Sequence, residues 1–212
     1  MAKKIYYTFL LFCFCLQSVP AQSDATAQKL LSDLLTSIKS TAIKTDFRLT
    51  LTMKGNPSQT VNGTFTLKGN KFVLDMTQLK VYFNGMTQWS YMAQNNEVSI
   101  STPTAKELSE TNPMAILVNY SSKSNISFST ETKSNNNHCI EMIPSTKDKD
   151  ISKILVTINK SNNELYSIKI IYKNGNLNNL VLSNYKKDIQ VNDDTFEFKK
   201  SKFKGVVIND LR

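Results

Sequence analysis

The stretch TDFRLTLTMKGNPSQTVNGTFTLKGNKFVLDM, residues 45–76, decides the fold of this chain. Apolar side chains alternate with polar ones in three successive runs within it. Alternation with a period of two is typical of strands that bury one face. The turns Gly55-Asn56-Pro57-Ser58 and Gly69-Asn70 separate the runs. Strands joined by such short turns pair antiparallel, so this stretch predicts three strands of a meander.

The same alternation continues through most of the chain, divided by turns such as Asn84-Gly85 and Asn174-Gly175. Further strands are predicted at residues 80–83, 87–92, 97–101, 126–132, 139–143, 153–159, 165–172, 178–185 and 195–198. The pattern is interrupted at residues 103–120, where Pro113 opens an apolar run. Proline is favoured in the first turn of a helix. This insert therefore predicts one or two short helices.

A longer helix is predicted ahead of the strands, from Asp24 to Lys39. Its apolar residues recur three or four positions apart, which is the spacing of one buried helical stripe. They are Ala27, Leu30, Leu31, Leu34, Leu35 and Ile38. Ser23 or Asp24 can cap the first backbone amides with a side-chain oxygen.

These elements predict a mainly β protein of the α+β class. One curved antiparallel sheet of about 10–11 strands would be covered by the leading helix and the short helical insert. Two short helices cannot cover the apolar face of so wide a sheet. Either the sheet closes on itself as a filled barrel, or it forms an unclosed β-barrel with a hydrophobic cavity beneath the helices.

The N-terminus predicts export. Lys3 and Lys4 precede an uncharged run from Ile5 to Leu16, followed by a small-residue cleavage site after Ala21. Residues 1–21 are therefore expected to be a cleaved signal peptide, and residues 22–212 a single domain in the periplasm. A retained membrane anchor is the alternative, and the short apolar run argues against it.

The predicted domain is basic and has few groups suited to catalysis. Removal of the two leader lysines lowers the formal charge from +9 to +7. Its one cysteine, Cys139, follows its one histidine, His138, and strand neighbours point to opposite faces. The chain is therefore expected to be no enzyme and to hold no metal or cofactor. The positive charge favours contact with membrane surfaces or acidic cargo. The scattered lysines and the predicted export argue against nucleic acid.

Four segments have a recognisable order and spacing: the leading helix with TDFRLTLTM, then VYFNGMTQWSYMAQNNEVSI, TNPMAILVNY and the C-terminal DDTFEFKKSKFKGVVINDLR. Together they resemble the LolA family of periplasmic lipoprotein carriers. The resemblance covers nearly the whole exported chain, and it lies in the order and spacing of the segments. It implies an unclosed barrel with a helical lid over an apolar cavity. It also implies a monomer that takes acylated lipoproteins from an inner-membrane lipoprotein-releasing transporter and delivers them to an outer-membrane acceptor or to the membrane itself.

The sequence departs from the family at one turn. Proteobacterial carriers have an Arg-Pro pair between the second and third strands, and the Arg ties down the lid. Here the turn is Lys68-Gly69-Asn70-Lys71. The latch would be Lys68 or Lys71, or it would be missing.

The alternation and the resemblance together predict a set of lipid-binding side chains in the cavity and its lid. These are Leu34, Phe47, Leu49, Phe65, Leu67, Phe72, Leu74, Trp89, Tyr91, Met114, Ile116 and Leu117. The segment around Pro113 is the expected lid, and Trp89 and Tyr91, with one polar end each, are expected at the cavity mouth. The alternative for each is an ordinary place in the protein core.

Three functions follow from this reading. The first is a carrier that binds the acyl chains of lipoproteins and moves them from the inner to the outer membrane. The second is a LolA-like module that binds another lipid or glycolipid, or senses the cell envelope, without lipoprotein transfer. The third is an exported enzyme, for which His138 is the one candidate residue.

Overall fold

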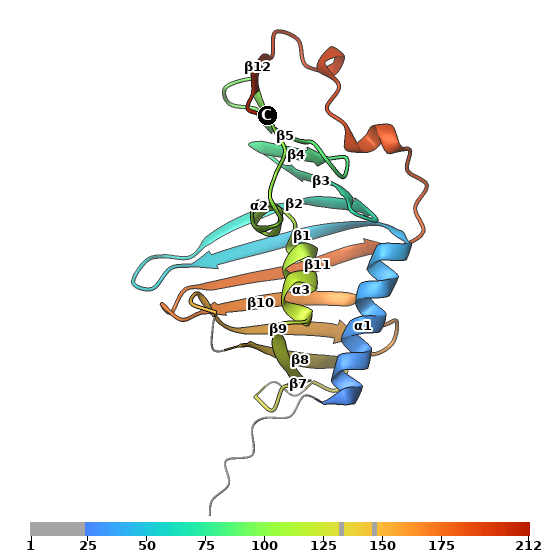
Figure 1. Cartoon of the computed structure of the whole chain (residues 1–212), viewed down its shortest axis with the longest axis vertical. Coiled ribbons are helices and arrows are strands. Elements are labelled where there is room, and N and C mark those ends of the chain that lie inside the picture. Colours follow the sequence, from blue (N-terminus) through green and yellow to red (C-terminus); the bar gives the residue numbers. More distant parts are fainter. Residues whose placement is uncertain (1–23, 132–133, 146–147) are drawn as a thin grey trace, which may run out of the picture.

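The computed structural model describes residues 24–131, 134–145 and 148–212. Within them the chain forms one strongly curved sheet with helices against its concave, inner face (Figure 1). The helices are α1 (Ala25–Ser40), α2 (Ala105–Thr111) and α3 (Pro113–Ser121), with short 3₁₀ turns η1 (Asp193–Phe196) and η2 (Lys200–Lys202). The strands are β1 (Ala42–Thr52), β2 (Gln59–Lys68), β3 (Lys71–Met76), β4 (Leu79–Phe83), β5 (Gln88–Met92), β6 (Glu97–Ser101), β7 (Ser124–Phe128), β8 (Asn137–Pro144), β9 (Ile151–Asn159), β10 (Leu165–Tyr172), β11 (Leu177–Lys186) and β12 (Val207–Asp210).

The twelve described strands follow the order β12-β6-β5-β4-β3-β2-β1-β11-β10-β9-β8-β7. All neighbours pair antiparallel except β12, which runs parallel to β6. Strands β12 and β7 lie at opposite edges, so the sheet is not closed. The predicted unclosed barrel is confirmed, and the alternative of a closed, filled barrel is wrong.

Helix α1 confirms the predicted leading helix. The Asp24 carboxylate accepts hydrogen bonds from the backbone N–H groups of Thr26 and Ala27, at 2.8 and 3.3 Å. These bonds satisfy two of the amides that a helix start leaves without partners. The buried stripe consists of Ala27, Leu31, Leu34 and Ile38.

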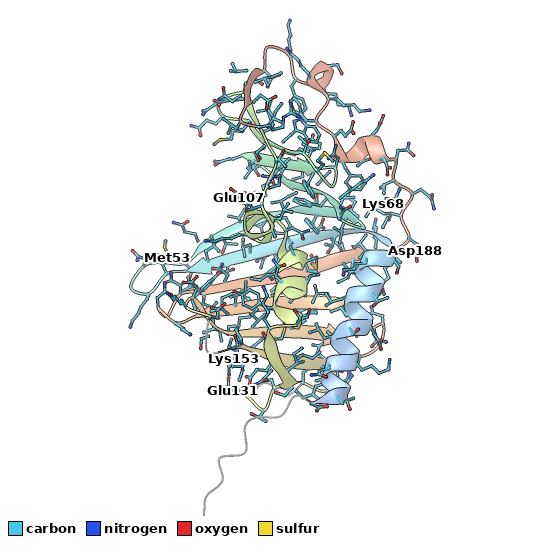
Figure 2. All side chains as sticks on the ribbon, in the orientation of Figure 1. Met53, Lys68, Glu107, Glu131, Lys153 and Asp188 are labelled. Atoms are coloured by element: carbon cyan, nitrogen blue, oxygen red, sulfur yellow. The ribbon has the colours of Figure 1, made fainter. Side chains whose placement is uncertain are left out.

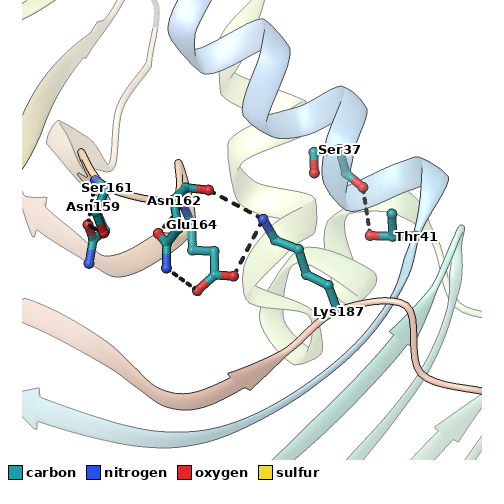
Figure 3. Close-up of polar contacts among 7 residues, drawn as sticks. All are labelled: Ser37, Thr41, Asn159, Ser161, Asn162, Glu164 and Lys187. Atoms are coloured by element: carbon teal, nitrogen blue, oxygen red, sulfur yellow. Dashed lines mark hydrogen bonds and ion pairs between the residues drawn. The ribbon is translucent and has the colours of Figure 1, made fainter.

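Polar contacts fasten the end of the sheet where α1 leads into β1 (Figure 3). The Thr41 hydroxyl donates to the Ser37 carbonyl at 2.9 Å. Nearby, the Lys187 ammonium lies 3.5 Å from the Glu164 carboxylate and also donates to the Asn162 carbonyl. The contacts of Lys187 tie the chain after β11 to the turn between β9 and β10.

The predicted insert forms two helices, α2 and α3. A capping box joins Thr104 and Glu107 at the start of α2. The Asn112 side chain accepts from the Met114 N–H at 2.9 Å and caps α3. Helix α3 lies in front of the inner face of the sheet, beside α1 (Figure 1).

The C-terminal strand prediction is corrected. Residues 195–198 do not form a strand: η1 ends at Phe196, and the chain then crosses the outer face of β3–β5. The alternating Phe196 and Phe198 resembled a strand, but both side chains pack on that outer face. The true last strand, β12, was not predicted. The predicted strand at 126–132 is also shorter, because β7 ends at Phe128.

Candidate functional site

A cavity of about 950 Å³ lies between the inner face of the sheet and the helices. Its apolar wall comes from strands β1–β4 and β8–β11, and from α2 and α3. Cross-strand partners share a face of a sheet. The pairs Phe47–Leu182 and Leu49–Leu180 between β1 and β11 therefore both line the hollow. The remaining apolar wall consists of Phe65, Leu74, Met76, Leu79, Ala105, Ile116, Pro144, Ile151, Ile168 and Ile170.

The hollow leaves apolar surface uncovered. Leu49, Leu74, Met76, Leu79 and Ile170 pack against the inner core yet are only partly buried. Beside them the inner core is close-packed. The Phe72 ring centroid lies 5.8 Å from that of Phe65 and 5.4 Å from that of Phe83. Apolar surface left in contact with water favours a ligand that covers it, at roughly 25 cal/mol per Å². The arrangement is therefore suited to binding an apolar molecule.

Gly63 sets the shape of the wall at Phe47. The two residues are cross-strand partners on β2 and β1. A Cβ atom at position 63 would lie 2.8 Å from the Phe47 ring and 2.4 Å from the Asp75 carbonyl oxygen. Only glycine lets the ring lie so close to the neighbouring strand.

Polar groups gather at the end of the cavity away from α1 (Figure 1). They come from the start of α2, the end of α3, the loop before β9 and the β10–β11 turn. They include Lys106, Asn119, Tyr120, Lys123, Ser145, Asp148, Asp150, Tyr172 and Asn178. The Asn178 side chain donates to the Tyr172 hydroxyl at 3.1 Å. We refer to this group as the polar end. It would suit the head group of a ligand whose chains lie along the apolar wall.

One hydrogen bond crosses the polar end and connects α3 to the loop before β9. The Tyr120 hydroxyl donates to Asp148 Oδ2 at 2.8 Å. Asp148 Oδ1 accepts from the N–H groups of Asp150 and Ile151, at 2.9 and 2.7 Å. The Ser145 N–H adds a second link by donating to the Lys123 carbonyl at 2.9 Å.

The two side chains of this link have shifted pKa values. Burial raises the pKa of Asp148, but the hydrogen bonds from Ile151, Tyr120 and Asp150 and the charge of Lys173 outweigh it, so the pKa lies below its usual value. Burial, followed by the hydrogen bond to Asp148, raises the pKa of Tyr120. At neutral pH the link therefore joins a neutral phenol to a carboxylate, which is a charge-assisted bond.

The structure brings five of the predicted site residues to the cavity wall: Phe47, Leu49, Phe65, Leu74 and Ile116. Five others are buried in the inner core beside it: Leu34, Leu67, Phe72, Met114 and Leu117.

Trp89 and Tyr91 do not lie at the cavity mouth, and their expected place is corrected. They are the cross-strand partners of Tyr82 and Lys80, on the outer face. Tyr91 lies 4.4 Å from Phe203 and 6.0 Å from Phe198 between ring centroids, beneath the C-terminal segment. Both faces of β4 and β5 carry apolar residues, so alternation alone does not tell which face is the inner one.

Sequence reasoning missed the half of the wall that β9–β11 supply. Ile168 and Ile170 on β10, and Leu180 and Leu182 on β11, line the hollow. The alternation within residues 165–172 and 178–185 already placed each pair on one face. Strand β11 pairs with β1, which joins β9–β11 to β1–β4 in one sheet. Only this pairing reveals that the apolar face of β9–β11 lines the same cavity.

Lys68 and Lys71 do not latch the lid. Both bind Asp193 of the C-terminal segment, at 3.2 and 2.7 Å, and Lys68 also donates to the Val191 carbonyl at 3.3 Å. Hydrogen bonds from Lys71 and then Lys68 lower the pKa of Asp193. Figure 2 labels Lys68 at the end of β2, beside the C-terminal segment. The two lysine alternatives for the latch are therefore corrected, and the alternative that this turn has no latch remains.

The described residues hold no group of three or more His, Cys, Asp or Glu side chains that could bind a metal. Cys139 is buried on β8 opposite Thr157 of β9, while His138 lies 5.7 Å from the Phe128 ring. Adjacent strand residues face opposite sides, so these two do not form a nucleophile and base pair. No helix in the described ranges is long and apolar enough to cross a bilayer.

Solved structures resemble this fold at low sequence identity. An uncharacterized conserved protein from Thermus thermophilus has a TM-score of 0.59 at 9% identity, covering 87% of this chain and 99% of that one. A LolA superfamily protein from Nitrosomonas europaea has a TM-score of 0.44 at 12% identity, covering 81% and 97%. A putative outer membrane lipoprotein-sorting protein domain from Vibrio parahaemolyticus has a TM-score of 0.42 at 11% identity, covering 81% and 96%.

No functionally curated protein matches the sequence. The family model described as outer membrane lipoprotein carrier protein LolA matches residues 17–184. This match spans the leading helix, strands β1–β10, the helical insert and nearly all of β11. The chain therefore belongs to the LolA family of outer membrane lipoprotein carrier proteins.

Proposed function

We propose that this protein is a periplasmic carrier that holds the acyl chains of lipoproteins in its cavity and ferries them from the inner to the outer membrane. The observation that carries the proposal is a hollow of about 950 Å³ whose apolar wall its own side chains leave partly uncovered. Residues 1–21, outside the described residues, would direct export and be cleaved, which leaves residues 22–212 as one lipid-binding domain. The donor would be an inner-membrane lipoprotein-releasing transporter, and the recipient an outer-membrane acceptor or the membrane itself.

The energetics of transport favour a cavity of this kind. Hiding an acyl chain of about 16 carbons from water stabilises it by roughly 10 kcal/mol, at about 0.8 kcal/mol per CH₂. A carrier needs to recover part of that energy and still release its cargo. A hollow with one polar end, covered by a short helix, meets both needs because it covers the chain without enclosing it on all sides.

Residues of the wall and of the lid have different parts in this proposal. Phe47, Leu49, Phe65 and Leu74 would contact acyl chains from the sheet, and Ile116 would contact them from α3. Leu34, Leu67, Phe72, Met114 and Leu117 would hold the wall and lid in shape from behind. Helix α3 would act as the lid, since it joins the sheet at the polar end through Tyr120 and Asp148.

The test is the binding of a fluorescent palmitoylated peptide against its unacylated form. Ile170→Glu places a carboxylate on the apolar wall, where its charge would have to be desolvated. We expect at least a tenfold loss of affinity for the acylated peptide. Lys169→Glu is the matched control, because it puts the same group one residue away on the opposite face of β10.

Leu49→Asn gives a second, milder change in the wall, and the melting temperature of each variant shows whether it folds. Equal affinity of folded Ile170→Glu, Leu49→Asn and unmodified protein for the acylated peptide would contradict the proposal. So would equal binding of acylated and unacylated peptides by the unmodified protein.

The polar end favours a second candidate, a module that binds a glycolipid or another lipid, or senses the envelope. The hydrogen-bonding groups of Tyr172 and Asn178 would suit a sugar head group. An assay of lipoprotein release from spheroplasts separates the two. A carrier releases acylated lipoprotein into solution when the purified protein is added, whereas a lipid-binding module would take up lipid and leave the lipoproteins in the membrane.

A further inference from the structure

Exposed apolar side chains gather at one end of the molecule. Among the described residues, nine large hydrophobic side chains are exposed, and five of them lie on β5, on β12 or within two residues of these strands. These five are Met86, Met92, Val207, Ile208 and Leu211. Met86 lies in the turn before β5, and Met92 at its end. Strand β6 separates β5 from β12. We refer to residues 197–212, with Met86 and Met92, as the C-terminal tip.

The C-terminal tip also carries a net positive charge. Residues 197–212 contain five basic and two acidic side chains, a net charge of +3. One of the two acids, Asp210, is paired with Arg212. Lys200, Lys202 and Lys204 are exposed around η2 and the turn that follows it. Figure 2 shows side chains with nitrogen ends projecting around this end of the molecule.

The chain at the tip is held in place, so its surface has a defined shape. The Asn96 side chain donates to the Lys204 carbonyl at 3.0 Å. The Val207 N–H donates to the Asn96 carbonyl at 3.0 Å, and the Leu211 N–H to the Ile100 carbonyl at 2.8 Å. The Phe203 ring packs on Tyr91 and Phe198, at centroid distances of 4.4 and 4.6 Å.

We propose that the C-terminal tip binds membrane surfaces rich in anionic lipid head groups. Lysines beside exposed aliphatic side chains fit such a surface, because the ammonium groups meet phosphates while the apolar side chains enter the interface. Neither the cavity of about 950 Å³ nor the one of about 350 Å³ is lined by residues of the tip. The proposed contact is therefore made by the surface of the tip and not by either cavity. This proposal goes beyond cargo binding and does not require that the cavity hold acyl chains.

Vesicle flotation tests the proposal. The purified protein is mixed with vesicles of phosphatidylcholine alone, or of phosphatidylcholine and phosphatidylglycerol in equal parts, at low and high salt. We expect binding to the anionic vesicles only, weakened by salt because exposed charges are screened. The triple variant Lys200→Gln, Lys202→Gln, Lys204→Gln removes three positive charges from the tip. Each lost charge should lower the partition coefficient between anionic vesicles and water about fivefold.

The matched control is Lys39→Gln, Lys44→Gln, Lys186→Gln, which removes the same charge from exposed lysines outside the tip. It should keep most of the vesicle binding. Leu211→Ser tests the apolar part and should weaken binding at both salt concentrations. Affinity for an acylated peptide in solution should be unchanged in both triple variants, so a failure of cargo binding and a failure of membrane binding are distinguishable.

Three outcomes would overturn the proposal. The first is failure of the unmodified protein to float with anionic vesicles, and the second is an equal loss of binding in the two triple variants. The third is a dimer in solution, detected by light scattering without lipid and abolished by Leu211→Ser, which would assign the tip to a second copy of the chain.

Discussion

The two faces of strands β3 and β4 are filled in different ways. On the outer face, Phe196 is fully buried against Val73 and Tyr82, and the C-terminal segment covers them. On the inner face, Leu74 on β3 and Leu79 on β4 line a hollow and are only partly buried. The same strands therefore support a filled core on one side and an unfilled one on the other.

The difference teaches where this chain stabilises its fold and where it leaves room for a ligand. A side chain in a close-packed core touches atoms on all sides, and its removal leaves a cavity. A side chain on the wall of an existing hollow already lacks neighbours on one side. The outer cluster should therefore contribute mainly to stability, and the inner wall mainly to binding.

The largest expected effect is on stability at the outer face. Phe196→Ala should lower the free energy of unfolding by about 3–5 kcal/mol, because it empties a fully buried aromatic site. Leu74→Ala should cost less, since its side chain already faces the hollow. Urea denaturation of both variants measures the two values. Equal losses would show that the two faces are packed alike and would break the comparison.

A smaller effect is expected at the polar end, where α3 joins the loop before β9. Tyr120→Phe removes the hydrogen bond to Asp148 and should shift the opening equilibrium of the lid by about 1 kcal/mol, or about fivefold. Stopped-flow mixing with a fluorescent fatty acid should show faster entry. An unchanged entry rate would mean that α3 is not held by this bond.

The same link predicts a dependence on pH. Because the folded-state pKa of Asp148 is lowered, its contribution to stability is present above the ordinary carboxyl pKa. That contribution is lost as the pH falls through the folded-state value. The difference in entry rate between Tyr120→Phe and the unmodified protein should therefore shrink in acid. The comparison is made with the same fatty acid analogue, whose own titration affects both proteins equally.

The sequence predicted the elements of this fold better than it predicted the site. Alternation identified β1–β11, with β7 predicted too long, and helical spacing identified α1, because each pattern depends on a nearby core. The sequence pattern did not predict β12, whose four side chains are all exposed and show no alternation of burial. It also misplaced Trp89 and Tyr91, because the C-terminal segment that covers their face is distant in sequence. The Tyr120–Asp148 link depends on where the end of α3 meets the loop before β9, which no local pattern contains.

The smallest expected effect sharpens the comparison at the outer face. Asp193→Asn removes the ion pairs to Lys68 and Lys71, which join the C-terminal segment to the turn between β2 and β3. Asp193 is exposed, so the loss of stability should be smaller than that of Phe196→Ala or Leu74→Ala and should vanish at high salt.

Hydrogen exchange at residues 190–198 is the more sensitive measurement of Asp193→Asn, because local release of the C-terminal segment need not unfold the sheet. If exchange there stays slow while Phe196→Ala accelerates it, the apolar cluster alone holds the segment. If Asp193→Asn accelerates exchange as much as Phe196→Ala does, the ion pairs to the β2–β3 turn hold the segment as strongly as the apolar packing does.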